Sequence, residues 1–191
     1  MKIQIILAGV GGQGILFSSR LFSELGLKLG LEVTGAETHG MSQRGGSVVA
    51  HIKIGGYQSP IIRGGTADIL YSLDENEAYK NLHFVKQGGH CFVNMPNGDR
   101  FNQNILDHLK KKHTSVHTFD ASGMAMEMGS VRAANICLIG WSAGTGLVPF
   151  AYQDLKDVLK SISRKSDLEQ NLQIFDSSVA RGKQKGAHLN I

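Results

Sequence analysis

Side chains able to do chemistry are crowded into one short segment without regular periodicity, Glu37-Thr-His-Gly-Met-Ser-Gln-Arg-Gly-Gly-Ser-Val48. Its arginine can grip a carboxylate or a phosphate through two parallel hydrogen bonds, and its histidine can exchange a proton near neutral pH. Its paired glycines let the backbone pass close to a ligand or another chain. A solvated loop with a charged tip is the alternative, but the density of reactive types favours a functional segment. The candidate contact residues are Glu37, His39, Gln43, Arg44, Gly45 and Gly46.

A second candidate is the glycine-rich turn Gly9-Val-Gly11-Gly-Gln-Gly14, which follows an apolar run and precedes a helical pattern. It fits G-x-G-x-x-G, and the helix that begins there offers free N–H groups that suit a phosphate. Glu37 lies roughly 20 residues further on, where a dinucleotide site places its acid. The alternative is that the glycines only permit a tight turn and close packing. The predicted ligand contacts are Gly9, Gly11, Gly12, Gln13 and Gly14.

The elements that would position these residues alternate between strand and helix. Apolar, β-branched runs predict strands over 3–10, 32–36, 47–54, 67–73, 90–94 and 115–120. Helical spacing predicts helices over 15–30, 75–85, 105–113, 123–128, 133–147, 152–162 and 167–180. We also expect residues 58–63 to form a hairpin partner of 47–54, and Gly88-Gly89 to form a turn.

This alternation predicts an α/β protein, a single-domain three-layer α/β/α sandwich with a Rossmann-like start. The sheet should be mostly parallel but mixed, because the expected hairpin is antiparallel. Residues 1–180 would form the domain. Residues 181–191 are polar and contain glycine, so we expect them to form a mobile tail.

Composition narrows the class of function. The chain has 191 residues, a net charge of +4 and basic residues spread along its length, which disfavours a nucleic-acid-binding protein. Cys91 and Cys137 are far apart and follow no ligand spacing, so we expect a cytoplasmic protein rather than a secreted disulfide framework. The eight histidines form no metal-ligand motif, and no apolar run approaches the roughly 20 residues of a membrane span. We therefore expect no metal site and no membrane association.

Together the two glycine motifs resemble those of the gamma-type subunit of 2-oxoacid:ferredoxin oxidoreductases. The resemblance extends over residues 3 to about 180. Its further matches are Ala67-Asp68-Ile-Leu70, Leu73 with Ala78, Gly88-Gly89, Arg132-Ala-Ala-Asn135 with Leu138 and Gly140, and Asn171 with Phe175. Many members resemble Gly-Pro-Glu-Met-Arg-Gly-Gly at the position of residues 37–48. This chain has instead the form typical of the beta subunit of indolepyruvate:ferredoxin oxidoreductases.

The resemblance implies a reaction in which a 2-oxoacid and coenzyme A give an acyl-CoA and CO2 while ferredoxin is reduced. It also implies thiamine diphosphate, Mg2+ and iron–sulfur clusters in the complex. This chain lacks the Gly-Asp-Gly and Asn-Asn signature of a thiamine site, and its two cysteines are too few for a cubane cluster. We therefore assign it no catalytic residue and no cofactor of its own. The thiamine and the clusters belong to partner subunits, with ferredoxin reached through the complex.

Under this interpretation residues 37–48 contact the partner near its active centre, and the glycine turn binds a phosphate-bearing ligand such as coenzyme A. Aryl 2-oxoacids such as indolepyruvate are the favoured substrates, with pyruvate, 2-oxoisovalerate and 2-oxoglutarate left open. The alternatives are a free-standing NAD(P)-dependent dehydrogenase and a flavin- or nucleotide-binding module. Either would use the same glycine turn.

Overall fold

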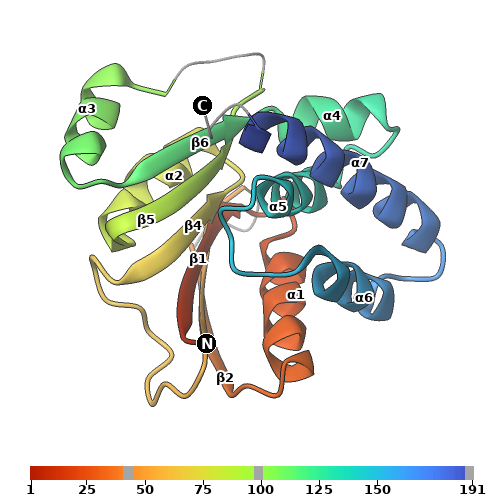
Figure 1. Ribbon diagram of the computed structural model, residues 1–191, viewed down its shortest axis with the longest axis horizontal. Helices are drawn as coiled ribbons and strands as arrows, with labels where there is room; N and C mark the ends of the chain where they lie inside the picture. Colours follow the sequence, from red (N-terminus) through yellow and green to blue (C-terminus); the bar gives the residue numbers. More distant parts are fainter. Residues whose placement is uncertain (41–44, 97–100, 188–191) are drawn as a thin grey trace.

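The computed structural model describes residues 1–40, 45–96 and 101–187, which fold around one six-stranded sheet (Figure 1). The strands are β1 (Ile3–Val10), β2 (Val33–His39), β3 (Ser47–Ile54), β4 (Ala67–Ser72), β5 (Val85–Asn94) and β6 (Ser115–Phe119). Their order across the sheet is β2-β3-β1-β4-β5-β6. Only β3 runs against the others, pairing antiparallel with both β1 and β2. The predicted mixed, mostly parallel sheet is confirmed.

Helices cover both faces of this sheet. They are α1 (Ile15–Lys28), α2 (Glu75–Asn81), the 3-10 turn η1 (Leu82–Phe84), α3 (Gln103–Lys111), α4 (Ala121–Glu127), α5 (Ala134–Gly144), α6 (Tyr152–Ile162) and α7 (Leu168–Ala187). One core joins the sheet to α1, α4, α5, α6 and α7, and the other joins it to α2, η1 and α3. Figure 1 shows these two groups on opposite sides of the strands, which confirms the predicted α/β/α sandwich.

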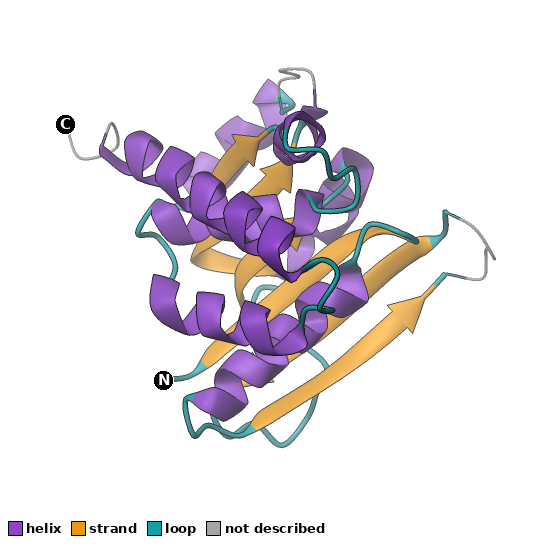
Figure 2. Cartoon of the chain, turned by 90° about the vertical axis from the view of Figure 1, so that its right-hand side faces the viewer, coloured by secondary structure: helices purple, strands orange, loops and turns teal. Residues whose placement is uncertain are grey.

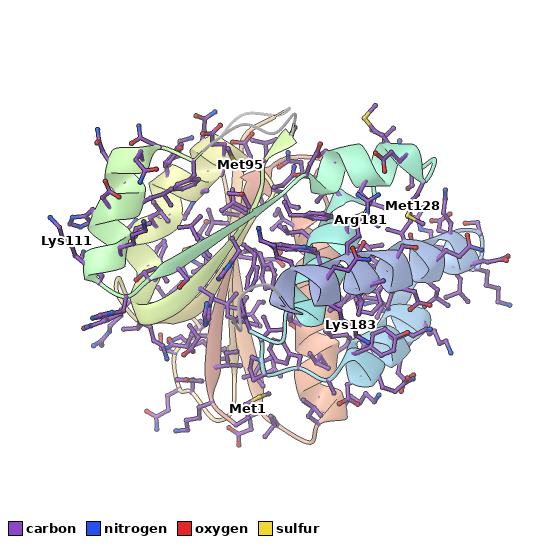
Figure 3. The ribbon with its side chains drawn as sticks, turned by 45° about the horizontal axis from the view of Figure 1, so that its top comes forward. Met1, Met95, Lys111, Met128, Arg181 and Lys183 are labelled. Atoms are coloured by element: carbon purple, nitrogen blue, oxygen red, sulfur yellow. The ribbon has the colours of Figure 1, made fainter. Side chains whose placement is uncertain are left out.

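Helix α7 differs from the predicted ending of the chain. The predicted helix ended at residue 180, whereas α7 continues to Ala187. Gly182 is the reason, because a Cβ placed there would lie 2.1 Å from the carbonyl oxygen of Trp141. The missing side chain lets α7 pack directly on α5, while Arg181 and Lys183 are exposed on either side of it (Figure 3). Residues 181–187 therefore belong to α7, and the rest of the predicted tail, 188–191, lies outside the described residues.

Three local predictions were wrong, two of them because of the way β3 pairs along both of its hydrogen-bonding edges. Residues 58–63 form no strand, because both edges of β3 are already paired with β1 and β2. The partner of β3 is β2, which extends to His39 and so includes part of the segment expected to be a loop. Gly88-Gly89 lies within β5, where the register with β4 shifts between Ala67 and Ile69. No helix in the described part of the chain has the length and apolar character needed to cross a membrane.

The order of the strands creates a topological switch point at their carboxyl ends. Helix α1, which follows β1, belongs to one core, and α2, which follows the neighbouring β4, belongs to the other. The two connections leave the sheet toward opposite faces, and such a switch point is where open α/β sheets bind ligands. The amino end of the antiparallel β3 lies at this same edge. The fold therefore brings the two glycine motifs of the sequence to one place.

Candidate functional site

The glycine turn occupies residues 11–14, between the end of β1 and the start of α1. Gly12 and Gly14 have φ angles of 99° and 81°, which strain any residue with a side chain. Gly14 is also the N-cap of α1, and a Cβ there would lie 2.6 Å from Nδ2 of Asn135. Around Gly12 a Cβ would meet nothing within 4 Å. Gly14 is thus fixed by packing, whereas Gly12 faces open space.

Gln13 holds the turn to the strands. Its Oε1 accepts a hydrogen bond of 2.8 Å from the backbone N–H of Val10, and its Nε2 donates one of 3.1 Å to the carbonyl of Leu73, at the end of β4. The bonded amide also occupies the space beside Gly9, where a Cβ would lie 2.7 Å from Oε1. In this arrangement Gln13 and Gly9 stabilise the turn from inside the protein. Their direct contact with a ligand remains a prediction.

The second glycine motif lies directly against the first. The backbone N–H of Gly11 donates a 2.9 Å hydrogen bond to the carbonyl of Gly46, and the φ of Gly45 is 70°. Next to them Ser47 donates a 2.6 Å hydrogen bond from its hydroxyl to Oε2 of Glu77. Glu77 is buried in α2 and pairs with Lys80 at 2.7 Å. The start of β3 is therefore held on one side by the glycine turn after β1 and on the other by helix α2.

The other predicted contact residues are distributed along the same segment. Glu37 lies in β2 opposite Ala50, with an exposed side chain, and the backbone of His39 pairs with that of Val48. Gln43 and Arg44 lie outside the described residues. The structure thus brings Gly11 together with Gly45 and Gly46.

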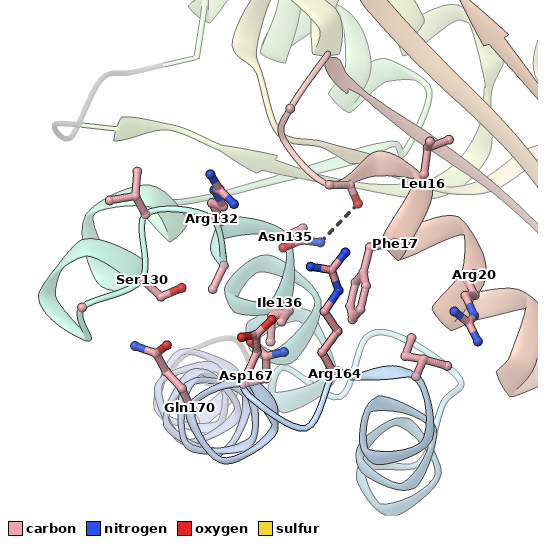
Figure 4. A pocket seen from close by; sticks show the side chains of 17 residues that line it. Leu16, Phe17, Arg20, Ser130, Arg132, Asn135, Ile136, Arg164, Asp167 and Gln170 are labelled. Carbon is pink, nitrogen blue, oxygen red and sulfur yellow. Dashed lines mark hydrogen bonds between the residues drawn. The ribbon is translucent and has the colours of Figure 1, made fainter.

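A pocket of about 780 Å3 opens beside the glycine turn (Figure 4). Arg20, Arg132 and Arg164 line it, and none of the three forms an ion pair with a described residue. Asp167 is the acid among the lining residues. The rest of the wall comprises Gly12, Gly14, Leu16, Phe17, Gly129, Ser130, Val131, Ala133, Asn135, Ile136, Ile162, Gln170 and Asn171. With three guanidinium groups against one carboxylate, the pocket suits an anionic ligand.

Asn135 joins the two sides of this pocket. Its buried side-chain amide donates to the carbonyl of Gly14 at 3.2 Å, drawn as a dashed line in Figure 4, and to the hydroxyl of Ser18 at 3.3 Å. The start of α5 is thereby tied to the first turn of α1. The sequence motif that ends at Asn135 therefore has a structural role at the glycine turn.

The pocket arginines were missed as a group by the sequence analysis. They come from α1, from the connection before α5 and from the connection after α6. No local spacing joins three single arginines so far apart in the chain. The one signal was Arg132, which belongs to the motif with Asn135.

The cysteines and the His90–His117 pair lie outside this pocket, and burial keeps them in their uncharged forms at neutral pH. Burial raises the pKa of the Cys91 thiol to about 12 and that of Cys137 to about 11, so both stay protonated at neutral pH. Burial, aided by His90 and Lys185, lowers the pKa of His117 to about 4, and its Nε2 lies 3.3 Å from Nδ1 of His90. Across residues 1–40, 45–96 and 101–187, no three His, Cys, Asp or Glu residues gather as metal ligands do.

Comparison with known proteins identifies the family. Residues 4–181 match the family model described as pyruvate ferredoxin/flavodoxin oxidoreductase. The chain belongs to this family. It is 31% identical to the indolepyruvate oxidoreductase subunit IorB of Archaeoglobus fulgidus, over 90% of this chain and 91% of that protein. It is 30% identical to the IorB of Thermococcus kodakarensis, over 96% and 97%. These relatives confirm the resemblance and the expectation that the chain is part of an enzyme.

Solved structures confirm the fold of this family member. The keto/oxoacid ferredoxin oxidoreductase gamma subunit of Geobacter sulfurreducens superposes with a TM-score of 0.71 at 20% identity, covering 95% of this chain and 99% of that one. The 2-oxoglutarate:ferredoxin oxidoreductase of Magnetococcus marinus superposes with a TM-score of 0.78 at 24% identity. The match covers 96% of this chain but 31% of that longer one. The same fold thus occurs both as a separate subunit and as part of a larger chain.

Proposed function

We propose that this family member is the non-thiamine subunit of a cytoplasmic complex that oxidatively decarboxylates a 2-oxoacid. The carboxylate leaves as CO2, the acyl group passes to the thiol of coenzyme A, and two electrons pass to ferredoxin. Thiamine diphosphate, Mg2+ and iron–sulfur clusters belong to partner subunits and supply the decarboxylation and the electron transfer. Relatives named as subunits of indolepyruvate and of pyruvate/ketoisovalerate oxidoreductases support this assignment.

The observation that carries the proposal is the hydrogen bond between Gly11 and Gly46, which unites the two glycine motifs. It joins Gly46 to the phosphate-type turn at one edge of the sheet, and Gly12 and Gly14 of that turn line the arginine-containing pocket. One edge can thus meet both a partner subunit and a ligand. Arg44, Gly45 and Gly46 face the partner near its active centre in this proposal.

The proposed ligand of the turn and pocket is coenzyme A. Its phosphates carry the negative charge that Arg20, Arg132 and Arg164 can balance. The first N–H groups of α1, preceded by Gly14, lack helical partners and point where a phosphate binds at a helix start. A dehydrogenase or free nucleotide-binding module would use the same turn, but the family match over residues 4–181 disfavours both.

Aryl 2-oxoacids are the proposed substrates. One support is the sequence motif of residues 37–48. The other is the identity of 29–31% to four relatives named as IorB, compared with 23–29% to ketoisovalerate and pyruvate/ketoisovalerate subunits. The test is to reconstitute the chain with the thiamine-carrying subunit of the same organism. Ferredoxin reduction is then compared with indolepyruvate, phenylpyruvate, pyruvate, 2-oxoisovalerate and 2-oxoglutarate. The highest kcat/KM is expected with an aryl substrate, and a preference for pyruvate would reassign the substrate class.

A further inference from the structure

Strand β2 is seven residues long, and its outer edge is not paired with any described strand. β2 is the terminal strand of the sheet, and no described residue pairs with its outer side. Figure 2 shows it as the arrow along the open edge, leading toward the grey segment. The strand has neither proline, lysine nor arginine, and its register with β3 is uninterrupted. It therefore lacks the proline, the lysine and the bulge that often keep an exposed edge from pairing with another chain.

The hydrogen bonds at both ends of β2 show which backbone groups are free. Gly40 donates to the carbonyl of Ser47, and Gly55 donates to the carbonyl of Glu32, so even-numbered residues bond to β3. Bonding alternates along an antiparallel ladder. The N–H and C=O groups of Val33, Gly35 and Glu37 consequently point away from the sheet. They form a ready template for one more strand.

A groove of about 440 Å3 lies beside this edge, between β2 and α1. Small residues leave it open, namely Ser19 and Ser23 on α1 and Gly35 and Ala36 on β2. Leu27, which borders it, is 58% exposed although it is a large apolar side chain. A strand added to β2 could insert a side chain here and cover Leu27. Backbone template and groove together fit an extended segment of another polypeptide.

Charge distinguishes between two possible occupants. Glu32, directly before the strand, and Glu37, within it, are both exposed. Two copies of the chain joined edge to edge would place four such carboxylates along one seam, and β2 has no lysine or arginine to offset them. A segment bearing lysine or arginine would instead complement them.

The opposite edge of the sheet is better protected. The strand there, β6, has five residues and follows the basic run Lys110, Lys111 and Lys112. Short strands and lysines both discourage edge pairing. The contrast marks β2 as the edge left open for a partner.

We propose that an extended, basic segment of the thiamine-carrying subunit adds to the sheet along β2, with one side chain in the groove beside α1. The proposal rests on the proposed function, because that subunit is its partner. It also agrees with the course of the chain, since β2 leads into the Glu37–Val48 segment. The added strand would extend the proposed partner contact from the carboxyl ends of the parallel strands along the outer side of β2.

The test compares two substitutions at Gly35 in the reconstituted complex. Gly35→Pro removes the outward N–H, whereas Gly35→Ala keeps it and places the same Cβ, 3.0 Å from the carbonyl oxygen of His51. Both variants place a Cβ in the groove, so Gly35→Ala sets the baseline against which the loss of the N–H in Gly35→Pro is measured. Gly35→Pro should associate about tenfold more weakly than Gly35→Ala, as the loss of one backbone hydrogen bond implies. Equal association of the two variants overturns the proposal.

Hydrogen exchange of the wild-type chain gives an answer even if Gly35→Pro does not fold. The amides of Gly35 and Glu37 should exchange more slowly in the complex than in the free chain, and unchanged exchange overturns the proposal. Protection already present in a dimer of the free chain assigns the edge to a second copy and overturns it as well. Failure of the wild-type chain to associate with any thiamine-carrying subunit is a different result, because it removes the proposed function itself.

Discussion

The backbone N–H of Gly11 and the carbonyl of Gly46 are joined by a 2.9 Å hydrogen bond, so two glycine motifs that are separate in the sequence form one structural unit. The pairing of β1 with β3 places the two residues at the same end of the sheet. Ser47 and buried Glu77 fix the second motif from the α2 side. A change in either motif is therefore expected to affect the other.

Gly14→Ala should destabilise the fold by at least about 2 kcal/mol, because it combines a left-handed backbone with an overlap against Asn135. Thermal or urea unfolding of the isolated chain measures the loss. The matched control is Gly12→Ala, which has a positive φ but no neighbour within 4 Å. It should cost roughly 1–2 kcal/mol from the backbone alone. Equal losses at the two positions would contradict the role given to Asn135.

Arg164→Ala should weaken the binding of coenzyme A by about 10- to 100-fold, the value of one charge-assisted hydrogen bond to a phosphate. Gly12→Val should also weaken it, because the side chain would enter the open space beside the turn. Calorimetric titration of the complex with coenzyme A measures both. Arg181→Ala is the control, since Arg181 pairs with Glu127 away from the pocket. Unchanged affinity in both test variants removes coenzyme A from this site.

Arg44→Ala should lower acyl-CoA formation by the reconstituted complex at least about tenfold, if the guanidinium makes one charge-assisted contact with the partner or its ligand. Initial rates and gel filtration separate lost activity from lost assembly. Lys111→Ala on α3 is the control, because Lys111 is an exposed basic residue outside the Glu37–Val48 segment (Figure 3). Normal activity and normal assembly of Arg44→Ala would contradict the proposed contact of Arg44 with the partner subunit.

The stability of the fold should fall as the pH is lowered from about 6.5 to about 4, because His117 has a pKa of about 4 in the folded chain against 6.5 for an unperturbed histidine. In that window the unfolded chain binds a proton that the folded chain excludes, so folding loses free energy as the pH falls. The loss is on the order of 3 kcal/mol and is absent above the window.

Urea unfolding at pH 7.5 and pH 4.5 measures this effect. His117→Phe keeps the stack on Phe92, whose ring centre lies 5.1 Å away, and removes the titrating group. It should flatten the pH dependence, whereas His108→Gln, on exposed α3, should leave it as in the wild-type chain. A variant at position 117 that still loses the same stability would assign the effect to other groups.

Periodicity and turn chemistry predicted most of the fold. Tyr152–Ile162 was predicted with its observed bounds, and β1 and β3 were predicted as strands over their full lengths. The errors arose where long-range pairing overrides local pattern. No local signal shows that β3 is already paired on both edges, and this pairing is what excludes residues 58–63 from the sheet.

The candidate site divides in the same way. Its glycines were predictable, because tight turns and close approach have a local signature. The arginine pocket was not, because Arg20, Arg132 and Arg164 meet only after α1, α5 and α6 have packed. The bond of Gln13 to Leu73 could not be predicted either, since Leu73 directly follows another strand, β4.

The antiparallel β3 also has a consequence for how the chain folds. β2 and β3 follow each other closely and can pair as a local hairpin, whereas β1 must wait for either β3 or β4 to arrive from further along the chain. Loop closure favours the nearer contacts, so the hairpin is expected to form early and then dock on β1 as a unit. The reversal at its tip lies in the Glu37–Val48 segment. Substitutions there should therefore change the refolding rate as well as activity, and the kinetics of renaturation would report on the same residues that are proposed to contact the partner.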